Sequence, residues 1–453
     1  MRIKLPFPIT AEVFAAALSL PMPTFSEPLR VICTDSRLVE QGDLFVALRG
    51  QKGDGHAYLD EVHKRRGRLL SECAFKDATV VPDTRAALSA LAAASLAEHR
   101  VPVVAITGSV GKTGTKDAVA AALGVRFCVH KTPENLNNDL GVAFTVLSRP
   151  PQCEILVLEL GSDHRGEIAA HSKHIRPDVA IITAIGSAHI GEFGSLEETL
   201  KEKSDIIAGM REGTLFLNRD DPRLRTLFTG LSQKSIGIHL PADYRAENPR
   251  LSLFETAYTL STATASFPVR LCATGYPRIY ASLFALAVAD HFGIPPKEAA
   301  EALSRGEHAK GRQSVEMVGD LLLIDDSYNA SPEAVKAGLH LLSTVTDRTR
   351  IAVLGDMLQL GVHSAALHRR VGYFAAGCCE ELVPFGAFSD EILRGAIEGG
   401  LDAAHIHLCA DADACTAYLL ATLRGDSAIL IKSSHALGGD RIAEAIRKSI
   451  LKK

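Results

Sequence analysis

The chain has 453 residues, of which 47% are hydrophobic, and its formal net charge is -4. At about 150 residues per domain, this length predicts three domains with large cores. The slightly acidic balance argues against nucleic acid as a partner, because such binders neutralise phosphates with excess Lys and Arg. The apolar stretch at residues 13–20 is too short to span a bilayer. We therefore expect no membrane partner, and we expect a monomer.

The cysteines also indicate the compartment in which the protein works. Nine of them are spread along the chain, and no CxxC pair occurs. This usage is typical of reduced thiols that pack as small core residues in the cytosol. We expect a cytoplasmic protein.

The first part of the chain, residues 1–83, predicts a small α/β domain. An amphipathic helix is expected over residues 13–20, with Thr10 as its N-cap. Short strand-like runs follow at residues 29–33, 44–48 and 79–81. An alanine- and leucine-rich helix at residues 86–97 leads into the next domain.

Residues 84–308 predict a second domain with a mainly parallel sheet. Apolar strand patterns alternate with helical ones, which is typical of such sheets; the strands are expected at residues 101–107, 155–160, 179–182 and 215–217. Residues 258–260 and 269–272 indicate an antiparallel edge, and helices are expected at residues 115–123, 281–292 and 296–303.

The polar, basic stretch at residues 306–313 predicts a linker, after which the alternation restarts in a third domain over residues 309–453. Strands are expected there at residues 321–324, 351–354, 381–384 and 428–431. The fold class is therefore α/β, and the last domain is expected to be doubly wound.

One motif points to phosphate chemistry. The segment Thr107-Gly-Ser-Val-Gly-Lys-Thr113 lies between a predicted strand and a predicted helix. Its glycines let backbone N–H groups surround a phosphate, Lys112 supplies charge, and the Thr113 hydroxyl can bind Mg²⁺. The alternative is an ordinary glycine-rich turn with an exposed lysine.

Three further positions are weaker candidates when taken alone. Glu159 ends a hydrophobic strand, where a carboxylate is costly unless it is paired or binds a cation. His189 follows a strand and a small-residue turn, and could equally be a core or turn histidine. Lys203 is otherwise a solvated helix lysine, and Asn138 and its neighbours are otherwise loop residues.

Further motifs follow in order along nearly the whole chain. They are Thr34-Asp-Ser-Arg37, Asp54-Gly-His56, Asn135-Leu-Asn-Asn138, Glu159-Leu-Gly161, Gly186-Ser-Ala-His189, Gly311-Arg312, Asp325-Asp-Ser-Tyr-Asn-Ala-Ser-Pro332 and Leu354-Gly-Asp-Met-Leu358. Together with the phosphate loop, this ordered set resembles the Mur ligase family. The resemblance implies a UDP-sugar-binding first domain, a P-loop central domain and a Rossmann-like C-terminal domain that binds the incoming amine.

The resemblance implies roles for the residues at the matching positions. It assigns ATP binding to Thr107, Gly108, Ser109, Gly111, Lys112, Thr113, Arg312, Asp325, Asp326 and Asn329. Of these, Asp325 or Asp326 would bind the ribose, and Asn329 would lie near the adenine. It assigns Mg²⁺ to Thr113, Glu159 and His189, and catalytic positions to Lys112, Asn138, His189 and Lys203. Lys203 falls where the family has a carbamylated lysine, which requires a neutral amine. Ser36, Arg37, Asp54 and His56 would contact the uridine nucleotide substrate.

The implied activity is ATP-dependent C–N bond formation through an acyl phosphate. The motifs favour addition of D-alanyl-D-alanine to UDP-N-acetylmuramoyl-tripeptide in peptidoglycan precursor synthesis. An amino-acid-adding step of the same family and a folylpolyglutamate synthetase-like ligase are alternatives. A P-loop NTPase without ligase activity and a non-catalytic nucleotide-sugar-binding protein are the others.

Some positions depart from the family pattern. After Gly275, where the family has His-Asn and a further Asn, this chain has Pro277, Arg278 and Ala281. Ser331 replaces a common Asn, and Lys432-Ser-Ser-His435 replaces the more usual Lys-Gly-Ser-Arg. We therefore expect an active enzyme with altered nucleotide contacts at residues 277–281.

Overall fold

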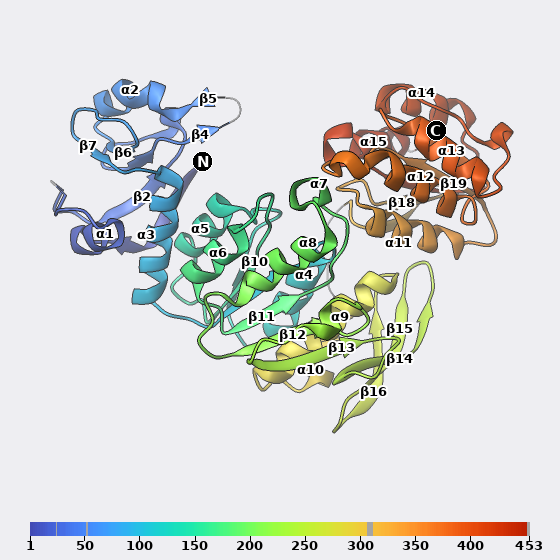
Figure 1. The fold of residues 1–453 in the computed structure, drawn as a ribbon, viewed down its shortest axis with the longest axis horizontal. Coiled ribbons are helices and arrows are strands. Elements are labelled where there is room, and N and C mark those ends of the chain that lie inside the picture. The colour runs from blue at the N-terminus through green and yellow to red at the C-terminus, as the bar shows by residue number, and fades with distance from the viewer. Residues whose placement is uncertain (24, 51–52, 306–310, 451–453) are drawn as a thin grey trace.

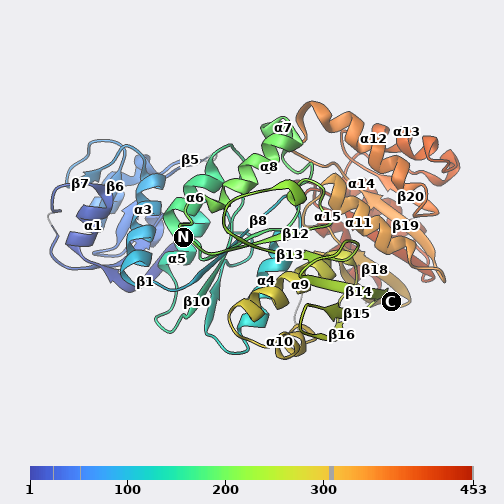
Figure 2. The same cartoon turned by 60° about the horizontal axis from the view of Figure 1, so that its bottom comes forward.

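The computed structural model describes residues 1–23, 25–50, 53–305 and 311–450. Figure 1 shows three lobes in chain order, and Figure 2 shows the same order from a second direction. In both views the first and third lobes lie on opposite sides of the central one. Residues 306–310 of the predicted linker lie outside the described residues.

The first lobe is built on a five-stranded sheet. Its strands are, in spatial order, β1 (Arg2–Ile9), β2 (Leu29–Cys33), β3 (Leu44–Val46), β6 (Arg68–Ser71) and β7 (Ala78–Val80). The same segment forms helices α1 (Ala11–Leu18) and α2 (Leu59–Lys64) and the ribbon of β4 (Arg49–Gly50) and β5 (Gly53–Asp54). Thr10 caps α1 as predicted, because its side chain accepts a hydrogen bond from the Val13 N–H.

The central lobe contains a nine-stranded sheet. The spatial order is β16 (Ser266–Leu271), β15 (Thr256–Ser261), β14 (Tyr244–Leu251), β13 (Ser232–Gly237), β12 (Thr214–Asn218), β11 (Val179–Ile182), β8 (Val103–Thr107), β10 (Ile155–Glu159) and β9 (Val129–Lys131). The strands from β9 to β14 pair in parallel, whereas β14, β15 and β16 pair antiparallel. The predicted antiparallel edge is confirmed.

Helices cover both faces of the central sheet. They are α3 (Thr84–Glu98), α4 (Lys112–Leu123), α5 (Asp139–Leu147), α6 (Glu167–Ile175), α7 (Ile190–Phe193), α8 (Leu196–Ser204), α9 (Tyr276–His291) and α10 (Pro296–Leu303). Because successive strand residues face opposite ways, Val103 and Ala105 pack with α3, α5 and the first lobe, while Val104 and Ile106 pack with α4 and α9. The helix α3 thereby joins the first lobe and the central sheet in one core.

The third lobe is doubly wound, as predicted. Its sheet has the order β17 (Ser314–Val318), β18 (Leu321–Asp325), β21 (Ser427–Lys432), β19 (Thr349–Leu354) and β20 (Glu381–Pro384), and only β17 pairs antiparallel. The helices are α11 (Pro332–Ser343), α12 (Ser364–Ala375), α13 (Ser389–Glu398), α14 (Ala412–Thr422) and α15 (Gly439–Ile450). The first three pack on one face of the sheet and the last two on the other.

The predicted strands and helices named above are found within a few residues of their expected ends. The strand β1 was not predicted, because Pro6 and Pro8 interrupt its pattern. Proline is tolerated on an edge strand, and β1 lies at the edge of its sheet. Within the described residues, no helix is both long and apolar enough to cross a membrane.

Candidate active site

The strand order brings three loops together at the carboxyl ends of neighbouring strands in the central sheet. β8 lies between β10 and β11, with Thr107 beside Ile182 and Ile106 beside Glu159. In open parallel sheets, ligands bind outside the carboxyl ends of the strands. Three segments start at these strand ends: the phosphate loop, the loop after Glu159 and the turn that carries His189.

The phosphate loop is seated on the turn that follows β11. Ser109 donates from its N–H to the Ala184 carbonyl at 2.8 Å and from its hydroxyl to the Gly186 carbonyl at 3.1 Å. Gly108 has a φ of +141°, and a Cβ there would lie 2.1 Å from Thr183 Oγ1. Only glycine fits this position, so the loop backbone lies close to the turn that follows β11.

Lys112 begins α4, after Gly111 in the left-handed conformation. Its Nζ donates to the carbonyl of Gly108 at 2.7 Å, so the side chain folds back over the loop. Burial lowers the pKa of Lys112; nearby Glu159 opposes this shift, and Arg312 adds to it. An anion over the loop would favour the charged amine.

Glu159 is buried at the end of β10, with only 1% of its surface exposed. Its Oε1 accepts from the Thr113 hydroxyl at 3.1 Å and from Asn137 Nδ2 at 2.8 Å. Its Oε2 has no hydrogen-bond partner among the described residues, and Lys116 Nζ lies 3.8 Å away. A buried carboxylate oxygen left in this state is suited to a cation.

Two residues of this cluster were not identified from the sequence. Lys116 is buried one helical turn after Lys112, and its Nζ donates to the Glu134 carbonyl at 2.9 Å. Its spacing from Lys112 and Thr113 on one helix was the available signal. Asn137 contacts Glu159 through its side-chain amide. The Asn138 side chain caps α5 by accepting from the Gly141 N–H at 2.9 Å.

Lys203 lies in a buried pocket near the end of α8. Its Nζ donates to Ser162 Oγ at 2.6 Å and lies 5.3 Å from the centre of the Phe193 ring. Burial, followed by the charge of Lys112, lowers the pKa of Lys203 to about 7. The amine is therefore substantially neutral near neutral pH, as carbamylation requires.

His189 is the N-cap residue that precedes α7, and its φ is +60°. Its Nδ1 lies 3.2 Å from Asp163 Oδ1 but has no hydrogen-bond partner among the described residues. Burial, aided by Lys112 and Lys203, lowers the pKa of His189 to about 4. The ring is neutral at physiological pH, which is the form that ligates metals.

The predicted metal-binding residues fit Mg²⁺ only as a partial shell. Within the described part of the chain, no three His, Cys, Asp or Glu side chains converge as a metal site. The Thr113 hydroxyl and the orphaned Oε2 of Glu159 nevertheless supply oxygen donors beside the phosphate loop. Mg²⁺ is usually held by one or two carboxylates together with substrate phosphates and water, so this donor set fits it.

The third lobe supplies Arg312 to the same site. Its guanidinium carbon lies 4.0 Å from the centre of the Tyr328 ring, and Tyr328 stacks on His435 with ring centres 5.7 Å apart. The charge of Arg312 contributes to lowering the pKa of Lys116, after burial. The structure thus brings Arg312 near the cations of α4.

The predicted ribose-binding aspartates are already paired. Asp325 Oδ2 accepts from Arg447 at 2.7 Å, and its Oδ1 accepts from the Ser327 hydroxyl. Asp326 Oδ2 lies 2.7 Å from Lys432 Nζ, which also donates to the Asn329 carbonyl at 2.9 Å. Burial raises the pKa of Asp326, whereas Lys432 opposes the shift.

A seam joins the central and third lobes beside His189. Glu333 on α11 accepts from the Ser187 N–H at 2.9 Å and from the Ser187 hydroxyl at 2.8 Å. A Cβ on Gly186 would lie 2.7 Å from Glu333 Cδ, so the contact needs glycine. Gly191 donates to the Gln359 carbonyl at 3.1 Å. The turn that holds His189 is therefore in direct contact with the third lobe.

The structure shows what surrounds the positions that depart from the family pattern. Pro277 lies in the first turn of α9, and Ala281 is buried, so neither offers a polar side chain. Ser331 caps α11 by accepting from the Ala334 N–H. Arg278 points between α4 and the third lobe, where its Nη2 donates to the Arg312 carbonyl at 2.6 Å.

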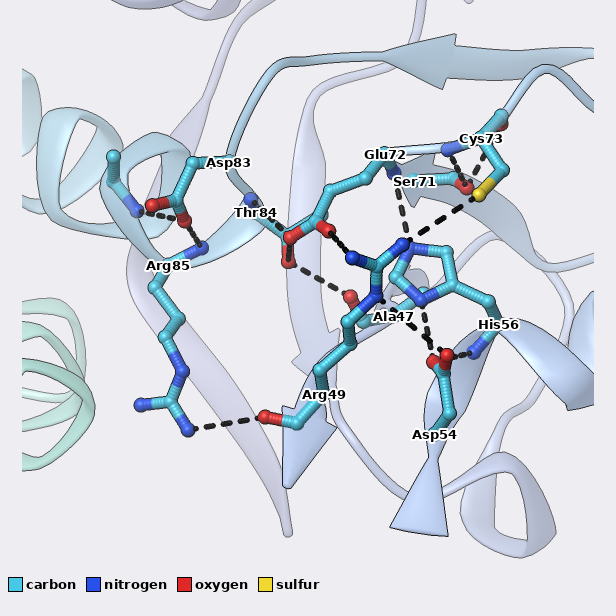
Figure 3. A network of polar contacts seen from close by, with 11 residues as sticks. Ala47, Arg49, Asp54, His56, Ser71, Glu72, Cys73, Asp83, Thr84 and Arg85 are labelled. Atoms are coloured by element: carbon cyan, nitrogen blue, oxygen red, sulfur yellow. Dashed lines mark hydrogen bonds and ion pairs between the residues drawn. The ribbon is translucent and has the colours of Figure 1, made fainter. Parts of the chain in front are cut away.

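The residues predicted to bind the uridine nucleotide lie in the first lobe, apart from the phosphate loop. Figure 3 shows that Asp54, His56, Arg49 and Glu72 form one polar network. His56 Nδ1 lies 2.6 Å from Asp54 Oδ1, and Arg49 reaches Glu72 at 3.3 Å. Arg37 is largely exposed and pairs with Asp35 at 2.7 Å, beside the buried Ser36.

Two family models match this chain over most of its length. Residues 106–289 match the Mur ligase middle domain, and residues 311–435 match the Mur ligase, glutamate ligase domain. The chain belongs to the Mur ligase family. The phosphate loop, Glu159, His189 and Lys203 of this Mur ligase lie in the first matched region, and Arg312 in the second.

Individual relatives match most of this Mur ligase chain. It is 33% identical to the Bacillus subtilis UDP-N-acetylmuramoyl-tripeptide--D-alanyl-D-alanine ligase, over 81% of this chain and 82% of the relative. The structure is similar to MurF from Acinetobacter baumannii, with a TM-score of 0.90, 28% identity and coverage of 98% and 100%. MurF ligase from Thermotoga maritima in complex with ADP matches with a TM-score of 0.85, 26% identity and coverage of 93% and 98%.

Proposed function

We propose that this Mur ligase joins D-alanyl-D-alanine to UDP-N-acetylmuramoyl-tripeptide, with conversion of ATP to ADP and phosphate, in peptidoglycan precursor synthesis. The observation that carries the proposal is the cluster at the end of β10 and the start of α4. There a buried carboxylate with an orphaned oxygen, Glu159, lies beside Thr113 and the phosphate loop. The relatives that match nearly the whole chain carry this activity in their names.

The reaction would proceed in two displacements. The terminal carboxylate of the tripeptide attacks the γ-phosphorus of ATP, the bond to the β-phosphate oxygen breaks, and ADP leaves. The amine of D-alanyl-D-alanine then attacks the carbonyl of the acyl phosphate, loses its proton, and expels phosphate. Both steps move negative charge between oxygens, so they depend on cations placed in advance.

The chain's own residues would provide this placement. The loop residues Thr107, Gly108, Ser109 and Gly111 and the amine of Lys112 would bind the phosphates of ATP. Thr113, Glu159 and His189 would hold Mg²⁺, which supplies Lewis-acid stabilisation of the phosphoryl oxygens when bound. Lys203 would support this cation site as a carbamate, because its neutral amine is available. Arg312 would reach the phosphates from the third domain.

Other residues would contact the nucleoside of ATP and the uridine nucleotide. Asp325 or Asp326 would bind the ribose; Asp325 is held by Arg447 and Ser327, and Asp326 is paired with Lys432. Asn329 would lie near adenine. Ser36, Arg37, Asp54 and His56 would contact the uridine nucleotide, and Asn138 would position the loop that presents Asn137.

We further propose domain limits of 1–83, 84–308 and 309–453, and action as a monomer in the cytoplasm. The three sheets fall within these limits. The cytoplasm is the compartment that supplies ATP and the UDP-linked precursor. Light scattering of the purified chain would test the monomer, and a dimer at micromolar concentration would contradict it.

The proposed activity is tested by measuring phosphate release and product mass. The reaction contains Mg-ATP and UDP-N-acetylmuramoyl-tripeptide, with or without D-alanyl-D-alanine. We expect release that requires the dipeptide, and a product heavier than the tripeptide substrate by the dipeptide less water. Release without any acceptor would favour an NTPase, and release only with a free amino acid would indicate another step of the family.

A further inference from the structure

Arg278 lies where three parts of the molecule meet. It sits in the first turn of α9, which packs along α4. A Cβ placed on Gly114, the residue after Thr113, would lie 3.9 Å from Arg278 Nη1. The other terminal nitrogen, Nη2, donates to the carbonyl of Arg312 in the third domain at 2.6 Å. The guanidinium therefore spans from the first turn of the phosphate-loop helix to the third domain.

The positive charge of Arg278 is poorly compensated. Among the described residues, no carboxylate lies within ion-pair distance of its guanidinium. Burial lowers the pKa of Arg278, while Asp326 and Asp117 act on it only from further away. Asp326 is already paired with Lys432 at 2.7 Å. A desolvated cation in this state is costly unless an anion joins it.

The surroundings of Arg278 repeat the same imbalance. Lys112, Lys116, Arg278 and Arg312 gather around the start of α4, and the charge of Arg312 lowers the pKa of the other three in addition to burial. Glu159 is buried in the same cluster, and the buried Asp326, which is paired with Lys432, acts on Arg278 from further away. The combined field of the four cations favours a multiply charged anion bound over this helix start.

We propose that Arg278 is a nucleotide-binding residue that contacts the α-phosphate of ATP and, through its bond to the Arg312 backbone, holds Arg312 toward the same phosphates. This inference rests on the proposed ATP-dependent function. In a phosphate loop, Lys112 serves the β- and γ-phosphates, and the α-phosphate lies toward the first helical turn. Arg278 Nη1 lies over Gly114 in that turn, so it meets the α-phosphate side.

The sequence of α9 gives this contact a reason. Pro277 and Ala281, one residue before and three residues after Arg278, carry no hydrogen-bonding side chain. Of these three positions, only Arg278 can therefore offer a side chain to a phosphate. A long, forked, permanently charged side chain suits both tasks, because one nitrogen can face phosphate while the other binds a carbonyl.

The test compares nucleotide affinities of Arg278→Met and Arg278→Lys by calorimetry and competition, with ADP and AMP as probes. Loss of a charged hydrogen bond predicts that Arg278→Met weakens ADP binding by about 10- to 100-fold. AMP should weaken by the same factor, because it keeps the α-phosphate. Arg278→Lys should recover part of the loss. The matched control is Arg270→Met, which removes an exposed arginine on β16.

Binding of UDP-N-acetylmuramoyl-tripeptide, measured on the same variants, reports whether the chain is folded, and it should not change. Wild-type affinity of Arg278→Met for ADP would overturn the proposal. Unchanged ADP affinity would overturn it whether or not kcat falls, and weakened ADP binding with unchanged AMP binding would overturn the α-phosphate assignment. Wild-type protein that binds ADP but forms no ligation product would instead defeat the proposed function.

Discussion

The buried amine of Lys203 makes a quantitative prediction about stability and pH. Its pKa of about 7, against an ordinary 10.5, arises from burial and then from the charge of Lys112. At pH 7.5 such an amine is about three-quarters neutral, compared with about 0.1% for an exposed lysine. The reactive, neutral form is therefore enriched by nearly three orders of magnitude.

The sign of the effect on stability follows from proton binding. Above about pH 7 the folded chain has released the Lys203 proton, whereas the unfolded chain keeps it up to about pH 10.5. The unfolded state thus binds more protons, and stability rises with pH in this window. Relative to Lys203→Met, the wild type should gain about 0.7 kcal/mol per pH unit at pH 7 and about 1.4 kcal/mol per pH unit well above it, or about 2 kcal/mol between pH 7 and 9.

Urea unfolding of wild type and Lys203→Met across this pH range measures the difference directly. Lys201→Met is the matched control, because Lys201 is exposed on the same helix and carries the same charge. Labelled bicarbonate, followed by NMR, should show a carbamate on wild type and none on Lys203→Met. A stability difference that stays constant from pH 7 to 9 would refute the depressed pKa and the reasoning built on it.

Other substitutions separate chemistry, domain coupling and folding. Glu159→Gln should lower kcat by about 100-fold and raise the Mg²⁺ concentration needed by about tenfold, in a magnesium titration of phosphate release; normal Mg²⁺ dependence would remove Glu159 from the metal site. Gly186→Ala should lower kcat about tenfold with ADP affinity unchanged, because its Cβ would lie 2.7 Å from Glu333 Cδ; unchanged kcat, together with an unchanged small-angle scattering profile, would contradict a role for the seam. Arg149→Met should cost about 3 kcal/mol in urea unfolding, because the buried guanidinium donates to the carbonyls of Val146, Ser95 and His99; wild-type stability would contradict it.

Local patterns account for the parts of the fold that the sequence predicted well. The phosphate loop could be recognised because strand, glycines, lysine and helix start are consecutive. Strands such as β10 and β11 are continuous apolar runs, since both faces of the central sheet are covered. In contrast, β1 contains prolines that only its position at a sheet edge makes acceptable.

The finer composition of the site depends on contacts between distant segments. Asn137 and Asn138 are equivalent in sequence, but the start of α5 claims Asn138 as its cap and leaves Asn137 to face Glu159. Asp325 and Asp326 are likewise adjacent, yet Asp325 is held by Arg447 from α15. Arg278 lies near the phosphate loop only because α9 packs on α4 beside the third domain. No local pattern contains that information.

The most direct test of the central claim is a transfer of heavy oxygen. UDP-N-acetylmuramoyl-tripeptide labelled in its terminal carboxylate is incubated with Mg-ATP, D-alanyl-D-alanine and the enzyme, and the released phosphate is analysed by mass spectrometry. An acyl phosphate intermediate predicts that one labelled oxygen passes from the carboxylate to each phosphate. Phosphate that carries no label would contradict activation of the carboxylate and, with it, the proposed ligase mechanism.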